Sequence, residues 1–331
     1  VVFMFGINIY EKRIIVFFVL LVTAVMMQSQ DVKNPVWPHD WPDPTVWQVE
    51  DGQYFCVATN PRRILSSHNL FDWTTSDFSP IDDESWEKMQ SISHHFWAPD
   101  VAVVNGRRLL YISLYNSAED SKIGVLKEVS PGHFQFHGII TSSNDTGIDD
   151  TIDPEVVTDA KTGKVWLFFG SVGGIHRIEL SHDGLSVKKN AKYVHVAGLS
   201  VRESPSRSNV FEGCYLHKRS GYWYMFVSSG FYGDHTYKLL VGRSKKLTGV
   251  FRSRDGNPMT KGHATPVIQS DEGDFFYGPG HCGEIFHKNG NDYIFYHCHN
   301  RNTNPNHRPM MLQEIKWDKE GWPYVVDGKP Q

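Results

Sequence analysis

The sequence predicts an all-β fold: a five-bladed β-propeller with four antiparallel strands in each blade. Three observations support this prediction. A short strand-like segment recurs along the chain, turn residues precede each copy, and no amphipathic helix of ten or more residues is evident. Repeats of roughly 50 residues built from short strands are typical of propellers, in which each blade is one small sheet. Residues 31–331 therefore form one predicted propeller domain.

The recurring segment is rich in aromatic and branched residues, which favour strands. Its five copies are Tyr54–Ala58, Leu109–Ser113, Trp166–Gly170, Tyr222–Phe226 and Tyr293–His297. An Asp-Gly, Asn-Gly, Thr-Gly or Ser-Gly turn precedes each copy. Further short strands are expected over residues 123–129, 175–180 and 238–243. A β-sandwich would also contain many short strands, but it would not repeat so evenly.

One ionisable residue precedes each copy at nearly the same distance. The five are Asp43, Asp100, Asp153, Glu212 and His281. The strand before the recurring segment should be the innermost strand of its blade, so these side chains are expected near the central channel. Turns favour Asp, which accounts for one or two of them. Five in phase, each next to Pro or Gly, favour a shared site.

Several carboxyl groups around one channel suit acid–base chemistry. Burial and mutual repulsion push their pKa values apart, so that one group keeps its proton while another is ionised. Hydrolysis of a glycosidic bond uses such a pair. A third carboxyl group can keep the acid protonated and orient it.

Five motifs in chain order resemble those of glycoside hydrolase family 43. They are Trp41-Pro-Asp43-Pro-Thr-Val46, Phe96-Trp-Ala-Pro-Asp100-Val101, Thr151-Ile-Asp153-Pro-Glu-Val156, Phe211-Glu212-Gly213-Cys-Tyr-Leu216 and Gly278-Pro-Gly280-His281. A single Asp-Pro pair is weak evidence, whereas five motifs at blade spacing are specific. The chain departs from the family at Cys214, where Pro is frequent.

The resemblance implies an inverting reaction and a role for each carboxyl group. Asp43 would be the general base that activates water, and Glu212 the general acid. Asp153 would modulate the pKa of the acid and orient it. Asp40 and Asp150 compete for the first and third roles. Asp43 and Asp153 are preferred because each directly precedes Pro, as the motif requires.

The segment Thr236–Ser244, followed by Leu247-Thr-Gly249, is similar to arabinan-cleaving members of the family. The resemblance therefore implies cleavage of α-1,5-linked L-arabinofuranosyl bonds in arabinan, a plant cell-wall polysaccharide. α-L-Arabinofuranosidase and β-xylosidase activities are the alternatives within the family. Phe96 and Trp97 would stack on the sugar beside the acid, with Asp100 also contacting substrate. Trp97 could equally pack within its blade.

His281 matches a histidine that, in arabinan-cleaving relatives, helps to hold a hydrated ion, usually calcium. Calcium prefers six to eight oxygen ligands, so water would have to supply most of them. A lone histidine is more often a satisfied core residue, and both interpretations stay open. No organic cofactor is expected.

Two other classes of propeller are less consistent with the motifs. A fructan-cleaving propeller of the invertase type would need Asn-Asp-Pro and Arg-Asp-Pro, whereas this chain has Pro42-Asp43 and Ile152-Asp153. A non-catalytic sugar-binding propeller would have no need for phased carboxyl groups.

The N-terminal residues predict export. Lys12 and Arg13 precede an apolar run over residues 14–27, too short for a membrane span of about 20 residues but suited to a signal peptide. Residues 1–30 are therefore a predicted signal peptide, with Met4 or a later residue as the start, and a membrane anchor is the alternative. No cysteine follows the run to accept a lipid. We expect a secreted or periplasmic protein without stable membrane insertion.

Charge and cysteine content bound the partners. The net charge of −4 gives no basic stripe, so nucleic acid is not an expected partner. We expect a monomer that binds arabinan or its oligosaccharides. The four cysteines, Cys56, Cys214, Cys282 and Cys298, form no Cys-x-x-Cys pair. They could be buried hydrophobic residues or disulfide partners.

Overall fold

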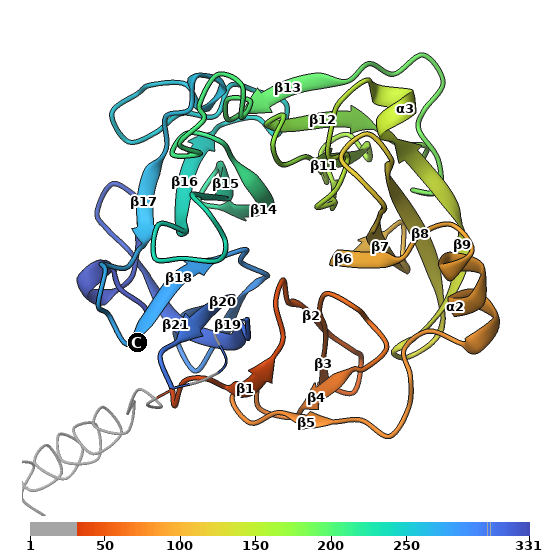
Figure 1. The fold of residues 1–331 in the computed structure, drawn as a ribbon, viewed down its shortest axis with the longest axis horizontal. Coiled ribbons are helices and arrows are strands. Elements are labelled where there is room, and N and C mark those ends of the chain that lie inside the picture. The colour runs from red at the N-terminus through yellow and green to blue at the C-terminus, as the bar shows by residue number, and fades with distance from the viewer. Residues whose placement is uncertain (1–31, 303, 305) are drawn as a thin grey trace, which may run out of the picture.

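The computed structural model describes residues 32–302, 304 and 306–331, and it confirms the five-bladed propeller (Figure 1). Five antiparallel sheets surround a central axis. The predicted signal peptide lies outside the described residues. No helix within the described part is long and apolar enough to cross a membrane.

The first four blades follow the chain from the innermost to the outermost strand. Blade one contains β2 (Thr45–Gln48), β3 (Tyr54–Val57), β4 (Leu65–Ser67) and β5 (Thr74–Thr75). Blade two contains β6 (His95–Val104), β7 (Arg107–Tyr115), β8 (Ser121–Ser130) and β9 (His133–Ser142). Blade three contains β10 (Glu155–Thr158), β11 (Val165–Phe169), β12 (Ile175–Glu179) and β13 (Val194–Ala197). Blade four contains β14 (Glu212–Arg219), β15 (Tyr222–Ser229), β16 (Lys238–Ser244) and β17 (Thr265–Ile268).

Blade five is built from both ends of the described chain. Its inner strands β18 (Phe276–Gly280) and β19 (Ile285–Lys288) both pair with β20 (Asn291–Asn300), which pairs with β21 (Pro309–Trp317). The outermost strand is β1 (Trp37–Asp40), which pairs with β21 through Trp37 and Met310. β22 (Pro323–Tyr324) extends the other end of β21. The first strand of the propeller therefore closes the last blade.

Short helices occupy the connections. α2 (Asp83–Gln90) links blades one and two, and Asp82 caps it by accepting the Ser85 N–H. α3 (Ser143–Thr146) follows blade two, while the 3-10 turns η1 (Met259–Lys261) and η2 (Val326–Gly328) lie near β17 and the C-terminus. None of these helices reaches ten residues, as the sequence predicts.

Each interface between neighbouring blades holds its own apolar core. The five clusters of buried side chains fall between blades one and two, two and three, three and four, four and five, and five and one. Tyr111 and Phe169, for example, pack in the cluster between blades two and three. Because each sheet buries both faces against its neighbours, most residues of its strands are apolar.

A ring of hydrogen bonds joins the inner strands of all five blades. In each blade one side chain accepts a backbone N–H from the next blade, at distances of 2.5 to 3.1 Å. We call these acceptors the interblade ring: Thr45, Asp100, Glu155, Tyr215 and Glu284. Each donor belongs to the following blade and is the residue directly after that blade's own acceptor. The donors are Val101, Val156, Leu216, Ile285 and Val46.

The interblade ring contains three carboxyl groups whose pKa values are raised. Burial raises the pKa of Asp100 and Glu155 well above their ordinary values, and the charge of Glu284 adds to the rise for both. Burial also raises the pKa of Glu284, to about 7. Asp100 and Glu155 are buried, whereas Glu284 stays partly exposed.

Candidate active site

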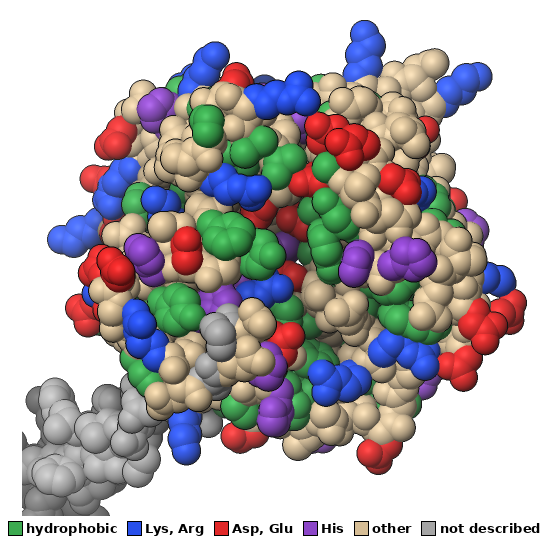
Figure 2. All heavy atoms as spheres, in the orientation of Figure 1, with side chains coloured by type: hydrophobic (Ala, Val, Ile, Leu, Met, Phe, Trp, Pro, Cys, Tyr) green, Lys and Arg blue, Asp and Glu red, His purple; other side chains and the backbone are tan. Residues whose placement is uncertain are grey.

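A pocket of about 410 Å³ lies where the inner strands begin, and it contains the three predicted catalytic residues, Asp43, Asp153 and Glu212. Asp150, His281 and the cation Arg308 also line it. Figure 2 looks onto this face of the propeller, where acidic side chains are visible deep in the central hollow. The predicted meeting of residues from different blades is therefore confirmed for these three carboxyl groups.

Left-handed backbone turns direct two of these carboxyl groups into the pocket. Asp43 and Asp153 have φ of 57° and 56°, values uncommon outside glycine. Their N–H groups donate to His297 Nδ1 and Ser113 Oγ of the preceding blade, at 3.1 and 2.9 Å. Two residues further along, Thr45 and Glu155 enter the interblade ring. The surrounding hydrogen bonds thus hold a conformation that costs about 1 kcal/mol or more in isolation.

Asp43 is surrounded by donors and positive charge. Thr59 Oγ1 donates to its Oδ2 at 2.6 Å, while His281 Nδ1 and Arg308 lie 3.3 and 3.6 Å from its Oδ1. Burial raises the pKa of Asp43, but His281, Arg308 and His297 together outweigh that effect and hold it well below the ordinary value. Asp43 is therefore ionised at neutral pH.

His297 lies beneath Asp43 as a neutral ring. Its Nδ1 accepts the Asp43 N–H, which requires that nitrogen to be unprotonated. Burial lowers the pKa of His297 to about 3, and the nearby Arg308 adds to this. The positive charge facing Asp43 therefore comes from Arg308, together with His281 when His281 is protonated.

Glu212 is the first residue of β14, and two hydroxyl groups fix its carboxyl group. Ser171 Oγ donates to Oε2 at 2.6 Å, and Tyr237 Oη donates to Oε1 at 2.8 Å. Asp153 accepts the N–H of the next residue, Gly213, at 3.2 Å. Burial raises the pKa of Asp153 well above its ordinary value, with further contributions from Glu212 and then Asp43.

The site therefore contains carboxyl groups in opposite states. Asp43 is held as a carboxylate, whereas Asp153 is driven toward its protonated form beside Glu212. Titratable groups whose environments push their pKa values apart are the arrangement that acid–base catalysis requires.

Aromatic rings form one wall of the pocket. Trp97 lines it and stacks on Tyr115, with ring centroids 4.2 Å apart and planes inclined by 26°. Phe96, the other predicted stacking residue, is buried against Trp86 and does not line the pocket. Asp100 also lies away from the pocket lining, because its carboxyl group accepts the Val156 N–H within the interblade ring. Of the three predicted substrate contacts, the pocket includes Trp97.

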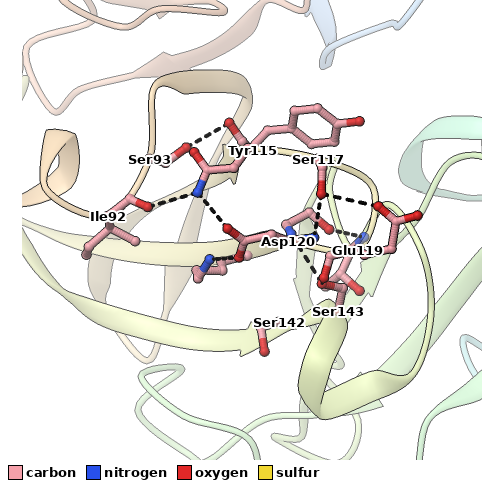
Figure 3. Close-up of polar contacts among 12 residues, drawn as sticks. Ile92, Ser93, Tyr115, Ser117, Glu119, Asp120, Ser142 and Ser143 are labelled. Carbon is pink, nitrogen blue, oxygen red and sulfur yellow. Dashed lines mark hydrogen bonds and ion pairs between the residues drawn. The ribbon is translucent and has the colours of Figure 1, made fainter.

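A polar network fixes the turn that carries Tyr115 (Figure 3). Ser93 Oγ donates to the Tyr115 carbonyl at 2.9 Å. Asn116 Nδ2 donates to the Ile92 carbonyl at 3.1 Å and to Asp120 Oδ2 at 2.8 Å. These bonds connect the β7–β8 turn to the segment before β6. Because Tyr115 ends β7 and Trp97 lies in β6, they fix the two strands that carry the stacked rings.

The structure also separates the two rival aspartates. Asp40 lies on β1, where its Oδ1 accepts the Arg308 N–H at 2.8 Å, and it does not line the pocket. Asp150 does line the pocket. The preference for Asp43 over Asp40 agrees with this placement.

Several pocket residues were missed by the sequence reasoning, notably Arg308, Tyr115 and Tyr237. No motif marks Arg308 or Tyr115, and Tyr237 lies in the segment Thr236–Ser244 without being singled out there. A weaker signal exists for the groups that support the carboxyl groups. In each blade a hydroxyl or imidazole side chain lies in the second strand or within two residues of its end: Thr59, Ser113, Ser171, Ser228 and His297.

The residues around His281 do not form a calcium site by themselves. Within the described residues, no three His, Cys, Asp or Glu side chains gather as a metal-binding group. His281 Nδ1 instead faces the Asp43 carboxylate. Calcium prefers six to eight oxygens, so most of its ligands would have to be water. The calcium site stays a prediction. The four cysteines are buried and free.

Comparison with known proteins agrees with this architecture. The chain is 30% identical over 301 residues to the extracellular exo-α-(1→5)-L-arabinofuranosidase ArbA of Cellvibrio japonicus, covering 86% of this chain and 85% of the relative. It is 29% identical to the extracellular endo-α-(1→5)-L-arabinanase 1 of Bacillus subtilis, covering 85% and 86% of the two chains.

A solved structure shares the fold. The α-L-arabinanase of Cellvibrio cellulosa, complexed with arabinohexaose, superimposes with a TM-score of 0.73 at 28% identity, covering 86% of this chain and 95% of that one. The model of Glycosyl hydrolases family 43 matches residues 32–323. With the propeller, the carboxyl groups and this match in agreement, the chain belongs to glycosyl hydrolase family 43.

Proposed function

We propose that this protein hydrolyses α-1,5-linked L-arabinofuranosyl bonds in arabinan with inversion of configuration. The observation that carries the proposal is the pairing, in one pocket, of the ionised Asp43 with Glu212 and its neighbour Asp153. Relatives of both exo and endo type, named for action on α-(1→5)-linked arabinose chains, support the choice of substrate.

Asp43 acts as the general base. It is held ionised by His281 and Arg308, and Thr59 fixes one of its oxygens. The carboxylate can therefore take a proton from a water molecule that attacks the anomeric carbon. Because the base is oriented before substrate arrives, little reorganisation is needed in the transition state.

Glu212 acts as the general acid and protonates the leaving oxygen. Tyr237 and Ser171 orient its carboxyl group. Asp153 is close enough that a negative charge on one group disfavours a negative charge on the other. Asp153, whose pKa is raised, therefore keeps a proton beside Glu212, and Glu212 is the group placed to protonate the leaving oxygen.

The Trp97–Tyr115 stack supplies an apolar surface for a sugar ring beside these groups. We also propose that the protein is exported. The relatives named as extracellular support this, together with the signal peptide predicted from residues 1–30.

The direct test is incubation with linear arabinan. The wild-type protein should release arabinose or short oligosaccharides, whose lengths distinguish exo from endo action, and proton NMR of the first product should show inverted configuration. Glu212→Gln and Asp43→Asn should each lower kcat by about 10²- to 10⁴-fold, the usual contribution of a general acid or base. Glu87→Gln, an exposed change on α2, is the matched control and should cleave normally.

Circular dichroism should show unchanged folding for all variants. The proposal fails if wild-type protein leaves arabinan intact, or if Glu212→Gln remains fully active on a natural linkage. Retained configuration would refute the inverting assignment alone.

A further inference from the structure

Asp150 is a pocket carboxyl group for which the proposed mechanism has no role. Its backbone is left-handed, with φ of 54°. Its N–H donates to the Ala118 carbonyl, and its own carbonyl accepts the Ile152 N–H, both at 2.9 Å. Ala118 lies in the same turn that carries Tyr115. Residues of two neighbouring blades therefore hold an uncommon conformation that places Asp150 among the pocket-lining residues.

One oxygen of this carboxyl group has no donor. Asp150 is 8% exposed, and its Oδ1 is buried without a hydrogen-bond partner among the described residues. Tyr115 lies close enough to the carboxyl group to oppose the rise of its pKa. A buried acceptor left without a donor is costly, and each such group needs an explanation. Rotation of the carboxyl group about χ2 exchanges its two oxygens, so a ligand in the pocket can supply the missing donor.

The charge of the pocket limits what that partner can be. Burial raises the pKa of Asp150 to about 6. Glu212 and Asp149 contribute to the rise, whereas Tyr115 and Arg207 oppose it. Above this pH the group is a carboxylate, which only accepts hydrogen bonds. A ligand that donates through O–H fits this acceptor.

We infer that Asp150 is a substrate-binding residue whose carboxyl group accepts a hydrogen bond from a hydroxyl group of the sugar unit beside the catalytic carboxyl groups. The inference rests on the proposed function, because that function supplies the sugar. It adds a fourth carboxyl group to the site, with a role in recognition rather than proton transfer. A site built to pair a substrate hydroxyl discriminates strongly against ligands that lack it.

The experiment measures arabinohexaose binding by calorimetry at pH 7.5 in the inactive Glu212→Gln background. Adding Asp150→Ala should weaken binding by about 10- to 100-fold, the range expected for a hydrogen bond to a charged group. Adding Asp150→Asn should restore part of the loss, because the amide oxygen still accepts. The matched control is Asp149→Ala. Its carboxyl group pairs with Arg202, 46% of its side chain is exposed, and its removal should leave the affinity unchanged.

The outcomes are separable. If Glu212→Gln does not bind arabinohexaose, both the substrate assignment and the Asp150 inference are overturned. If Glu212→Gln binds and the Asp150→Ala and Asp150→Asn variants bind equally well, the inference alone is overturned. A melting temperature that falls without a change in affinity would assign Asp150 a structural role and would also overturn the inference. Should Asp150→Ala fail to fold, an unchanged affinity of Asp150→Asn decides against it.

Discussion

Replacing Glu284 by Gln should remove a pH dependence of stability that is built into the interblade ring. Glu284 accepts the Thr45 hydroxyl at 2.7 Å and the Val46 N–H at 2.5 Å, and burial raises its pKa from 4.5 to about 7. The folded state therefore binds a proton that the unfolded state releases between these two values. Because the folded state holds more protons there, the free energy of unfolding must fall as pH rises through this window.

The size of the effect follows from the two pKa values. Their separation corresponds to about 3 kcal/mol in full, at about 1.4 kcal/mol for each pH unit, and most of it falls between pH 5 and pH 8. Asp100 and Glu155 are raised partly by the charge of Glu284. Removing that charge should ease their ionisation as well, so about 2.5 kcal/mol between pH 5 and pH 8 is a lower bound.

The assay is urea unfolding of the wild-type and Glu284→Gln proteins at both pH values. The loss of stability on going from pH 5 to pH 8 should be smaller in the variant by at least this amount. Glu87→Gln, which removes an exposed carboxyl group, should follow the wild type. Parallel losses in wild type and Glu284→Gln would show that Glu284 does not titrate in this range, and the account of the ring would be wrong.

Two further predictions concern the pocket. Trp97→Ala should raise KM for arabino-oligosaccharides several-fold with little change in melting temperature, because the ring lines the pocket. Phe96→Leu should lower the melting temperature with little change in KM, since Phe96 packs inside the blade. Identical effects of the two changes on KM would contradict the assignment of Trp97. If calcium binds near His281, EDTA should lower the melting temperature and added calcium should restore it, because an ion bound only to the folded form stabilises it. An unchanged melting temperature would rule out that ion.

The sequence predicts the blades correctly because each blade repeats the same turn and strand pattern. It misplaces Asp100 for a physical reason. Ala98 has the left-handed backbone in blade two that Asp43 and Asp153 have in theirs, and Asp100 lies two residues further along, with Thr45 and Glu155. Side chains alternate along a strand with a period of two. An alignment of the blades that is shifted by two residues therefore selects a side chain on the correct face of the sheet. That side chain lies further along the propeller axis than the pocket does.

Other features leave no local signal in the sequence. Arg308 reaches the pocket from just before β21, so its placement depends on how the blades pack. The sequence of β1 does not differ from that of an ordinary short segment before the first blade. Its pairing with β21 in the structure assigns it to blade five. Long-range pairing of this kind cannot be inferred from a period along the chain.

Blade five combines strands from the two ends of the described chain, and this affects the order in which the protein folds. Blades one to four can each form from contiguous chain, but β1 must wait for β21, which begins at Pro309. Pairing between such distant segments is slow because a large loop must close first. Closure of the circle should therefore be a late folding event, whether the chain emerges from a ribosome or from an export channel. Until then β21 presents an open edge to other chains, so inter-molecular strand pairing is the expected route to aggregation.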